Sequence, residues 1–186
     1  MSEDRQKVAS FPAVSGFGEC DAGGARETSD RAPSKETLRI LIADDQDLVR
    51  SGFRMILNSY DGLSVEGEAR NGEEAVYLAQ KIRPDVVLMD IRMPVRNGID
   101  ATRDITSNPL LSGTHVLVLT TFDIDEYVYD ALAAGASGFL LKDVDPDDLA
   151  QAIRVVHEGN ALIQPSITRR LVETYAASRS KARFDG

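Results

Sequence analysis

The strongest constraint on the fold is a series of short apolar runs, each followed by a polar side chain. Residues 38–43 are almost continuously apolar and precede Asp44 and Asp45, and a second run, residues 85–89, precedes Asp90. Continuous apolar character is typical of a strand buried on both faces of a parallel sheet, because a half-exposed strand would alternate. Parallel strands deliver their last residues to the same edge of the sheet. The sequence therefore predicts that the three carboxylates meet at one edge.

Three carboxylates at one edge repel one another and favour a bound cation. Ligands that are all oxygen suit a hard ion, and Mg2+ in particular takes only one or two carboxylates and keeps several waters. Two further runs, residues 115–119 and 137–141, are followed by Thr120 and Lys142. A hydroxyl and an ammonium group can bind the oxygens of a phosphoryl group during its transfer. The pattern predicts that Asp90 is a nucleophile that attacks phosphorus and forms an acyl phosphate.

Together these residues resemble the receiver domain of two-component response regulators. The matching positions, in chain order, are Asp44-Asp45, Asp90 with Met93-Pro94 and Gly98, Thr120, and Lys142. Segments 120–123 and 134–143 are similar to those of the NarL/FixJ-type subfamily, whose members carry a LuxR-type helix-turn-helix domain. The resemblance covers roughly residues 37–178, with element ends uncertain by about two to four residues.

The resemblance implies a role for each polar residue. Asp90 is the expected site of phosphorylation by a sensor histidine kinase, and Thr120 and Lys142 are expected to bind the phosphoryl oxygens. The implied Mg2+ ligands are the carboxylates of Asp44, Asp45 and Asp90 and the main-chain carbonyl of Arg92. The implied activity is that of a phosphoacceptor that assists its own phosphorylation and dephosphorylation, and not that of an enzyme in the usual sense.

Two positions differ from the pattern common in the family. Many receivers have Tyr as the switch aromatic that works with the hydroxyl residue Thr120, whereas this chain has Phe139, which can rotate between outward and inward positions but has no hydroxyl. Many also have Pro after the lysine, where this chain has Asp143. A cis peptide bond before a residue other than Pro costs about 2.5–4 kcal/mol, so the isomer of the Lys142–Asp143 bond stays open.

The chain divides into three parts. Residues 1–36 mix Gly, Ser, Ala, Pro and charges without regular hydrophobic periodicity, which predicts a disordered N-terminal extension. Residues 37–160 alternate apolar runs with amphipathic helical stretches and form the expected receiver domain. With right-handed crossovers, the predicted fold is a flavodoxin-like (βα)5 doubly wound parallel sheet with strand order 2-1-3-4-5, an order for which the receiver is itself a standard example.

Residues 161–186 contain a predicted C-terminal helix over 165–178 and the start of an interdomain linker. In the subfamily such a segment leads to the DNA-binding domain, and the remaining eight residues, 179–186, are too few to form one. We therefore expect transcriptional regulation through a domain absent from this chain, with phosphorylation favouring a homodimer. A free-standing receiver that acts through protein contacts is the alternative.

Composition agrees with this interpretation. The net charge of −9, from 21 Lys and Arg against 30 Asp and Glu, argues against nucleic-acid binding by this chain alone. The single cysteine, Cys20, excludes an intramolecular disulfide. The sequence offers no signal-peptide pattern and no apolar run of the ~18–20 residues that a membrane span needs, which predicts a cytoplasmic protein without membrane contacts.

Other classes of protein remain as alternatives. Taken singly, each aspartate could simply cap a helix or turn. Asp45-Gln46-Asp47 after a buried strand also resembles the nucleophile motif of haloacid dehalogenase-like phosphohydrolases, which would place the covalent phosphate on Asp45 and leave Asp90 and Met93-Pro94 unexplained. A flavodoxin-like cofactor module is disfavoured, because no Gly-rich phosphate loop follows the first strand.

Overall fold

The computed structural model describes residues 37–121, 127–169 and 172–173, and its centre is a parallel sheet. The strands lie in the order β2-β1-β3-β4-β5-β6, with every neighbouring pair parallel. Their bounds are β1 (Leu38–Ala43), β2 (Leu63–Ala69), β3 (Val86–Asp90), β4 (His115–Thr120), β5 (Gly138–Leu141) and β6 (Leu162–Ile163). The predicted order 2-1-3-4-5 is confirmed, and the sheet continues one strand further.

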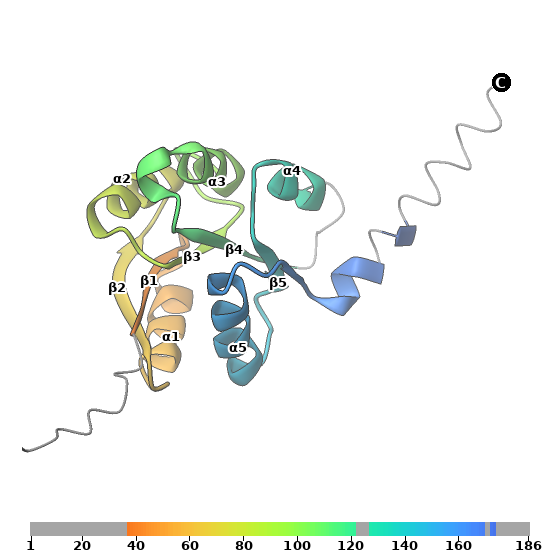
Figure 1. Ribbon diagram of the computed structural model, residues 1–186, viewed down its shortest axis with the longest axis horizontal. Coiled ribbons are helices and arrows are strands. Elements are labelled where there is room, and N and C mark those ends of the chain that lie inside the picture. Colours follow the sequence, from red (N-terminus) through yellow and green to blue (C-terminus); the bar gives the residue numbers. More distant parts are fainter. Residues whose placement is uncertain (1–36, 122–126, 170–171, 174–186) are drawn as a thin grey trace, which may run out of the picture. The chain divides into compact units, whose positions relative to one another are not determined.

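Helices cover both faces of this sheet, as Figure 1 shows. Helices α1 and α5 lie on one face, and α2, α3 and α4 lie on the other. Their bounds are α1 (Asp47–Leu57), α2 (Gly72–Ile82), α3 (Gly98–Ser107), α4 (Tyr127–Ala133) and α5 (Pro146–His157), with a single 3-10 turn, η1 (Pro109–Leu111), before β4. The architecture is the predicted flavodoxin-like fold.

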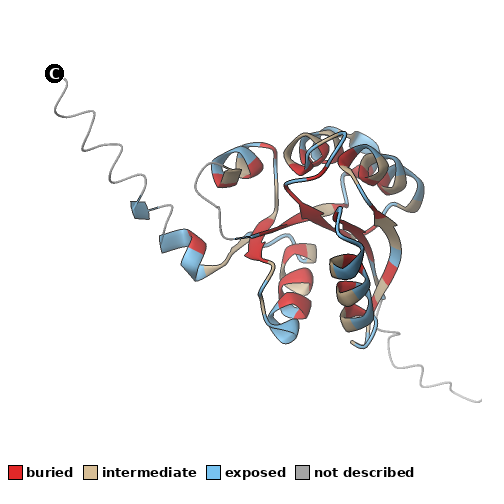
Figure 2. Cartoon of the chain, turned by 180° about the vertical axis from the view of Figure 1, so that it is seen from behind, coloured by how far each residue is buried: buried red, intermediate tan, exposed pale blue. Residues whose placement is uncertain are grey.

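The core consists of two apolar layers, one on each face of the sheet. Successive strand side chains alternate between them, so that Leu41 and Val87 pack beneath α2 and α3 while Ile40 and Val86 pack against α1 and α5. All five residues of β3 are buried, and Figure 2 shows buried residues running along the central strands. Burial on both faces explains why these strands are continuously apolar in sequence.

Local sequence sets where several helices begin. The Asn71 side chain accepts a hydrogen bond from the Glu74 N–H at the start of α2, and Asn97 accepts one from the Asp100 N–H at the start of α3. Pro146 occupies the first turn of α5, where its missing N–H has no consequence. These caps fix the helix ends beside the edge of the sheet at which the acidic residues lie.

The chain after α5 differs from the prediction, which has no strand beyond β5. Leu162–Ile163 pair in parallel with Gly138 and Phe139 of β5, and the Gln164 side-chain oxygen accepts a hydrogen bond of 2.9 Å from the Leu141 N–H. Residues 165–169 and 172–173 are helical, as predicted, and Ile167 is fully buried in the same layer as Phe139. A two-residue strand has no periodicity of its own, so the sequence pattern could not reveal it.

Three smaller observations complete the comparison. The fourth helix begins in the structure at Tyr127, and residues 122–126 lie outside the described part. The Lys142–Asp143 peptide bond is trans, since the described residues contain no cis peptide bond. No helix within the described ranges is long and apolar enough to cross a membrane.

Candidate functional site

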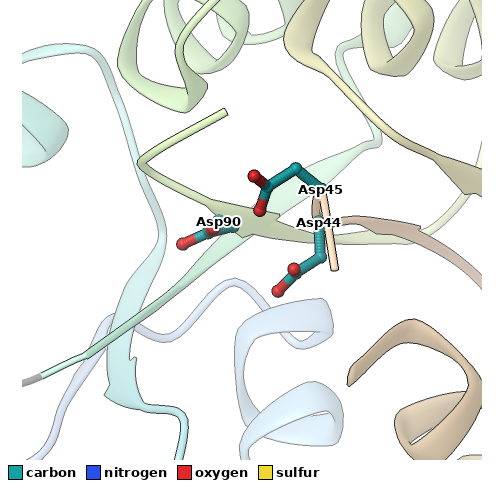
Figure 3. Close-up of side chains that lie close together, drawn as sticks. All are labelled: Asp44, Asp45 and Asp90. Atoms are coloured by element: carbon teal, nitrogen blue, oxygen red, sulfur yellow. The ribbon is translucent and has the colours of Figure 1, made fainter. Parts of the chain in front are cut away.

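Three aspartates meet at the carboxyl-terminal edge of the sheet (Figure 3). Asp90 is the last residue of β3, and Asp44 and Asp45 directly follow the neighbouring strand β1, whose last residue, Ala43, pairs with Met89. One carboxylate oxygen from each aspartate lies within 4.8 Å of the others. The close approach predicted from the strand ends is therefore present. An all-oxygen donor set of this kind fits a hard divalent cation such as Mg2+.

Asp44 is buried and makes several fixed contacts. It is 2% exposed, its N–H donates to the Ala69 carbonyl at 3.0 Å, and its Oδ1 accepts a hydrogen bond of 2.9 Å from the Gln46 N–H. Its Oδ2 lies 2.6 Å from the Nζ of Lys142. The carboxylate of Asp44 is therefore fixed in direction by both main-chain and side-chain contacts.

Lys142 also reaches Asp90, so that one ammonium group bridges two buried carboxylates. Its Nζ lies 3.1 Å from the Asp90 Oδ2, and the Asp90 Oδ1 accepts a hydrogen bond of 2.8 Å from the Ile91 N–H. The third aspartate, Asp45, is exposed. The site thus combines two fixed carboxylates with one that faces solvent.

Burial and charge shift the titration of the bridged groups. Burial raises the pKa of Asp90 above its usual value, and the negative charge of Asp44 adds to this, although Lys142 opposes the shift. Burial alone would lower the pKa of Lys142, but its hydrogen bond to Asp44 and the charge of Asp90 raise that pKa overall. The lysine is therefore held in its charged form, and this charge favours ionised Asp90.

Thr120 and Lys142 lie next to each other at the same edge. Thr120 is the buried last residue of β4, and its carbonyl accepts a hydrogen bond of 2.8 Å from the Lys142 N–H. Arg92 extends from the loop after β3, and its Nη2 donates to the Thr121 Oγ1 at 3.1 Å. The cavity at the site has a volume of about 210 Å3 and is lined by Asp45, Gln46, Asp90, Arg92, Thr121 and Lys142.

Comparison with known proteins identifies the family. The model of the response regulator receiver domain matches residues 40–154. This chain belongs to the response regulator receiver family. The receiver is 42% identical over 147 residues to the transcriptional regulatory protein YxjL of Bacillus subtilis, covering 78% of this chain and 66% of YxjL. It is 39% identical over 149 residues to the response regulator GacA of Pseudomonas protegens, covering 80% and 68% of the two chains.

Solved structures of response regulators support the same family assignment. A LuxR-family two-component response regulator from Aurantimonas superposes on the receiver with a TM-score of 0.70 and 33% identity, covering 76% of this chain and 99% of that one. The predicted resemblance to the receivers of the NarL and LuxR type is thereby confirmed. The chain spans 66%, 62% and 59% of the lengths of three curated transcriptional regulators that it matches.

Family membership removes the basis for the haloacid dehalogenase-like alternative. In that alternative Asp47 would be the second acidic residue of the active site. In the receiver, Asp47 instead lies in the first turn of α1, where its carboxylate pairs with Arg50. Among the described residues, the acidic side chains that cluster with Asp90 are those of Asp44 and Asp45.

Phe139 of the receiver occupies the inward position. It is fully buried and shares an apolar cluster with Val128 and Ala131 of α4 and with Ile167 beyond β6. Its backbone pairs with Val118 on one side and Ile163 on the other. The aromatic side chain therefore connects the strand that precedes Lys142 with both α4 and the C-terminal segment.

Two residues that contact the site were not singled out as contributors by the sequence pattern. Arg50 of α1 is buried and donates to the Asp44 carbonyl; the only sequence signal is its place in a stripe with Phe53 and Leu57, where an apolar residue would be expected. Gly98, noted in the sequence only as part of the family motif, packs directly on the main chain of Asp90. Neither relationship follows from local spacing.

Proposed function

We propose that this receiver is switched by Mg2+-dependent transfer of a phosphoryl group from a sensor histidine kinase to Asp90. The observation that carries the proposal is the bridge from Lys142 to Asp44 and Asp90, with Nζ to oxygen distances of 2.6 Å and 3.1 Å. Asp45 completes the acidic cluster. A carboxylate placed beside a fixed cation and further oxygen ligands suits phosphoryl transfer, which depends on positioning and charge neutralisation.

In the proposed reaction an oxygen of Asp90 attacks phosphorus and forms an acyl phosphate. The bond from phosphorus to the donor breaks, and the donor leaves with the electron pair, as an imidazole from a phosphohistidine or as acetate from acetyl phosphate. Burial raises the pKa of Asp90, and the charge of Lys142 opposes that shift and so favours the ionised carboxylate that can attack. The chain's own residues thereby prepare the nucleophile before the donor arrives.

The other proposed roles follow from position. Asp44, Asp45, Asp90 and the Arg92 carbonyl would hold Mg2+. When bound, the ion would neutralise charge on the phosphoryl oxygens. The Thr120 hydroxyl and the Lys142 ammonium would bind two of these oxygens, because their main chains are hydrogen bonded to each other at the same edge. The same groups would assist later hydrolysis, so that the receiver governs its own signal lifetime.

The output proposed for the longer protein is control of transcription. The matched relatives are named as transcriptional regulatory proteins, and they extend well beyond the length that this chain covers. We propose that phosphorylation draws Thr120 inward, stabilises the inward position of Phe139 and favours a symmetric dimer, which would align two DNA-binding domains on two half-sites. Action as a free-standing receiver through protein contacts is the second candidate.

Intact mass after incubation with acetyl phosphate tests the phosphoacceptor. Wild type should gain one phosphoryl group only when Mg2+ is present, and Asp90→Asn should gain none. Asp148→Asn, which removes an exposed aspartate from the first turn of α5, is the matched control and should label like wild type. The double variant Asp44→Ala, Asp45→Ala should lose labelling although it keeps the nucleophile. Equal labelling of wild type and Asp90→Asn would contradict the assignment.

Sedimentation velocity tests the output. Beryllofluoride with Mg2+, which mimics the phosphoryl group, should raise the dimer fraction of wild type and leave Thr120→Ala monomeric. An unchanged association constant in a wild type that has bound the mimic would show that dimerisation is not the output of this chain.

A further inference from the structure

A buried arginine touches the main chain of the acidic site. Arg50 of α1 is only 4% exposed, and its Nη1 donates to the Asp44 carbonyl oxygen at 2.6 Å. Its Nη2 contacts the Asp47 carboxylate, and its Nε lies 3.5 Å from the Glu68 Oε2 on β2. A buried charge is expensive unless it is paired, so these contacts stabilise the guanidinium in the direction that it takes in the structure.

The Asp44 carbonyl belongs to the peptide unit that joins Asp44 to Asp45. The peptide is planar, so an oxygen held by Arg50 fixes the plane and with it the positions of the Asp45 nitrogen and Cα, from which the Asp45 side chain starts. Asp44 has three further contacts of its own, with the Ala69 carbonyl, the Gln46 N–H and the Lys142 ammonium. Asp45 is exposed. The contacts that the structure describes include no hydrogen bond or ion pair of the Asp45 side chain, so its main chain sets its direction.

We propose that Arg50 is a positioning residue for the Mg2+ site, acting through the Asp44–Asp45 peptide. The inference rests on the proposed Mg2+-dependent function. Arg50 orients Asp45 towards Asp44 and Asp90, so that the three carboxylates form the cation site without first having to rearrange. Its role is geometric and distinct from that of the groups that touch the ion or the phosphoryl group.

Charge and geometry predict opposite effects for the loss of Arg50. A positive group near the site repels Mg2+, so its removal would tighten Mg2+ binding if charge were its main contribution. If Arg50 acts by orienting the peptide, its removal must weaken Mg2+ binding. The sign of the change therefore separates the two explanations.

Arg54 provides a matched control on the next turn of α1. Its Nη1 lies 2.6 Å from the Glu68 Oε1, so it shares a carboxylate partner with Arg50. Arg54 is more than half exposed, and its described contacts do not include Asp44. Arg54→Met and Arg50→Met remove the same charge from the same helix, but only the second removes the donor to the Asp44 carbonyl.

Isothermal titration calorimetry of the full chain with MgCl2 measures the Mg2+ dissociation constant directly. We expect Arg50→Met to raise the Mg2+ dissociation constant by about tenfold, the lower end of the effect of losing a residue that orients metal ligands. Arg54→Met should stay within about twofold of wild type. In the acetyl phosphate assay, Arg50→Met should need more Mg2+ for half-maximal labelling yet reach a rate near that of wild type at saturating Mg2+.

An unchanged or smaller dissociation constant in folded Arg50→Met would overturn the inference. If Arg50→Met does not fold in EDTA, as judged by circular dichroism, Arg50→Lys serves instead, because it keeps the charge and removes the planar fork. Weaker Mg2+ binding by Arg50→Lys supports positioning, and wild-type binding overturns it. If wild type itself fails to bind Mg2+, the proposed function fails and the inference fails with it, which is distinct from failure of the Arg50 variants alone.

Discussion

Replacing Gly98 with Ala should disturb both the stability of the domain and the phosphoacceptor. Gly98 is the first residue of α3, and its N–H donates to the Ile91 carbonyl at 2.8 Å. A Cβ at this position would lie 1.9 Å from the Asp90 carbonyl oxygen and 2.8 Å from the Asp90 carbonyl carbon. The φ angle of Gly98 is not in the left-handed region, so the requirement for glycine here is purely one of space.

The size of the effect follows from what the added methyl group meets. Overpacking usually destabilises by about 1–3 kcal/mol, and Gly98 should lie at the upper end because main-chain atoms cannot rotate away as a side chain can. The better helix propensity of Ala offsets roughly 0.5–1 kcal/mol of this. We therefore expect Gly98→Ala to lower the free energy of unfolding by about 2 kcal/mol, or the melting temperature by roughly 8 °C for a domain of this size.

Urea denaturation and the labelling assay measure the two consequences of Gly98→Ala. Labelling at Asp90 should slow, because the clash is with the main chain that holds the nucleophile. Gly52→Ala is the control, since a Cβ at Gly52 in α1 meets nothing within 4 Å; this variant should be about 0.5–1 kcal/mol more stable than wild type. A Gly98→Ala protein as stable as wild type and labelled at the same rate would refute the steric argument.

Three further predictions concern the opposite edge of the sheet and the C-terminal segment. Ile167→Ala should destabilise the domain by about 2–5 kcal/mol in urea denaturation, because it empties a fully buried position; a loss below 0.5 kcal/mol would mean that the segment is not docked. Gln164→Ala should cost about 1 kcal/mol, because the Leu141 N–H loses its acceptor. Burial, and then the neighbouring His157, lower the pKa of His115 below 6.5. The unfolded chain therefore binds the proton more tightly, and stability should fall as the pH drops below about 6.5 towards the lower folded pKa. His115→Gln should lose less stability than wild type between pH 7.5 and pH 5.5, and equal losses would contradict this.

The amino-acid sequence determined the fold class and the meeting of the acidic residues. Continuously apolar runs identify buried parallel strands, and right-handed crossovers leave few possible orders for them. The ends of parallel strands share one edge, so the sequence alone predicts that Asp44, Asp45 and Asp90 lie together, as they do in the structure. Both inferences depend on local periodicity and on general rules of chain connection, which a single sequence carries in full.

The tertiary structure alone decided contacts that depend on exact position. The strand β6 exists because the edge of β5 offers unpaired main-chain groups, which Leu162–Ile163 and the Gln164 side chain satisfy. Phe139 points inward because α4 and Ile167 enclose it. These contacts join separate elements of the fold, so no local spacing in the sequence reveals them.

The same distinction separates the residues of the site. The sequence places Asp90 at a strand end, but only the packed structure shows that Arg50 reaches the Asp44 carbonyl or that Gly98 has no room for a methyl group beside Asp90. Periodicity assigns a side chain to a face of a helix or strand to within several ångströms. A hydrogen bond or a steric contact is decided within a few tenths of an ångström, and that precision arises only when the helices and the sheet pack against one another.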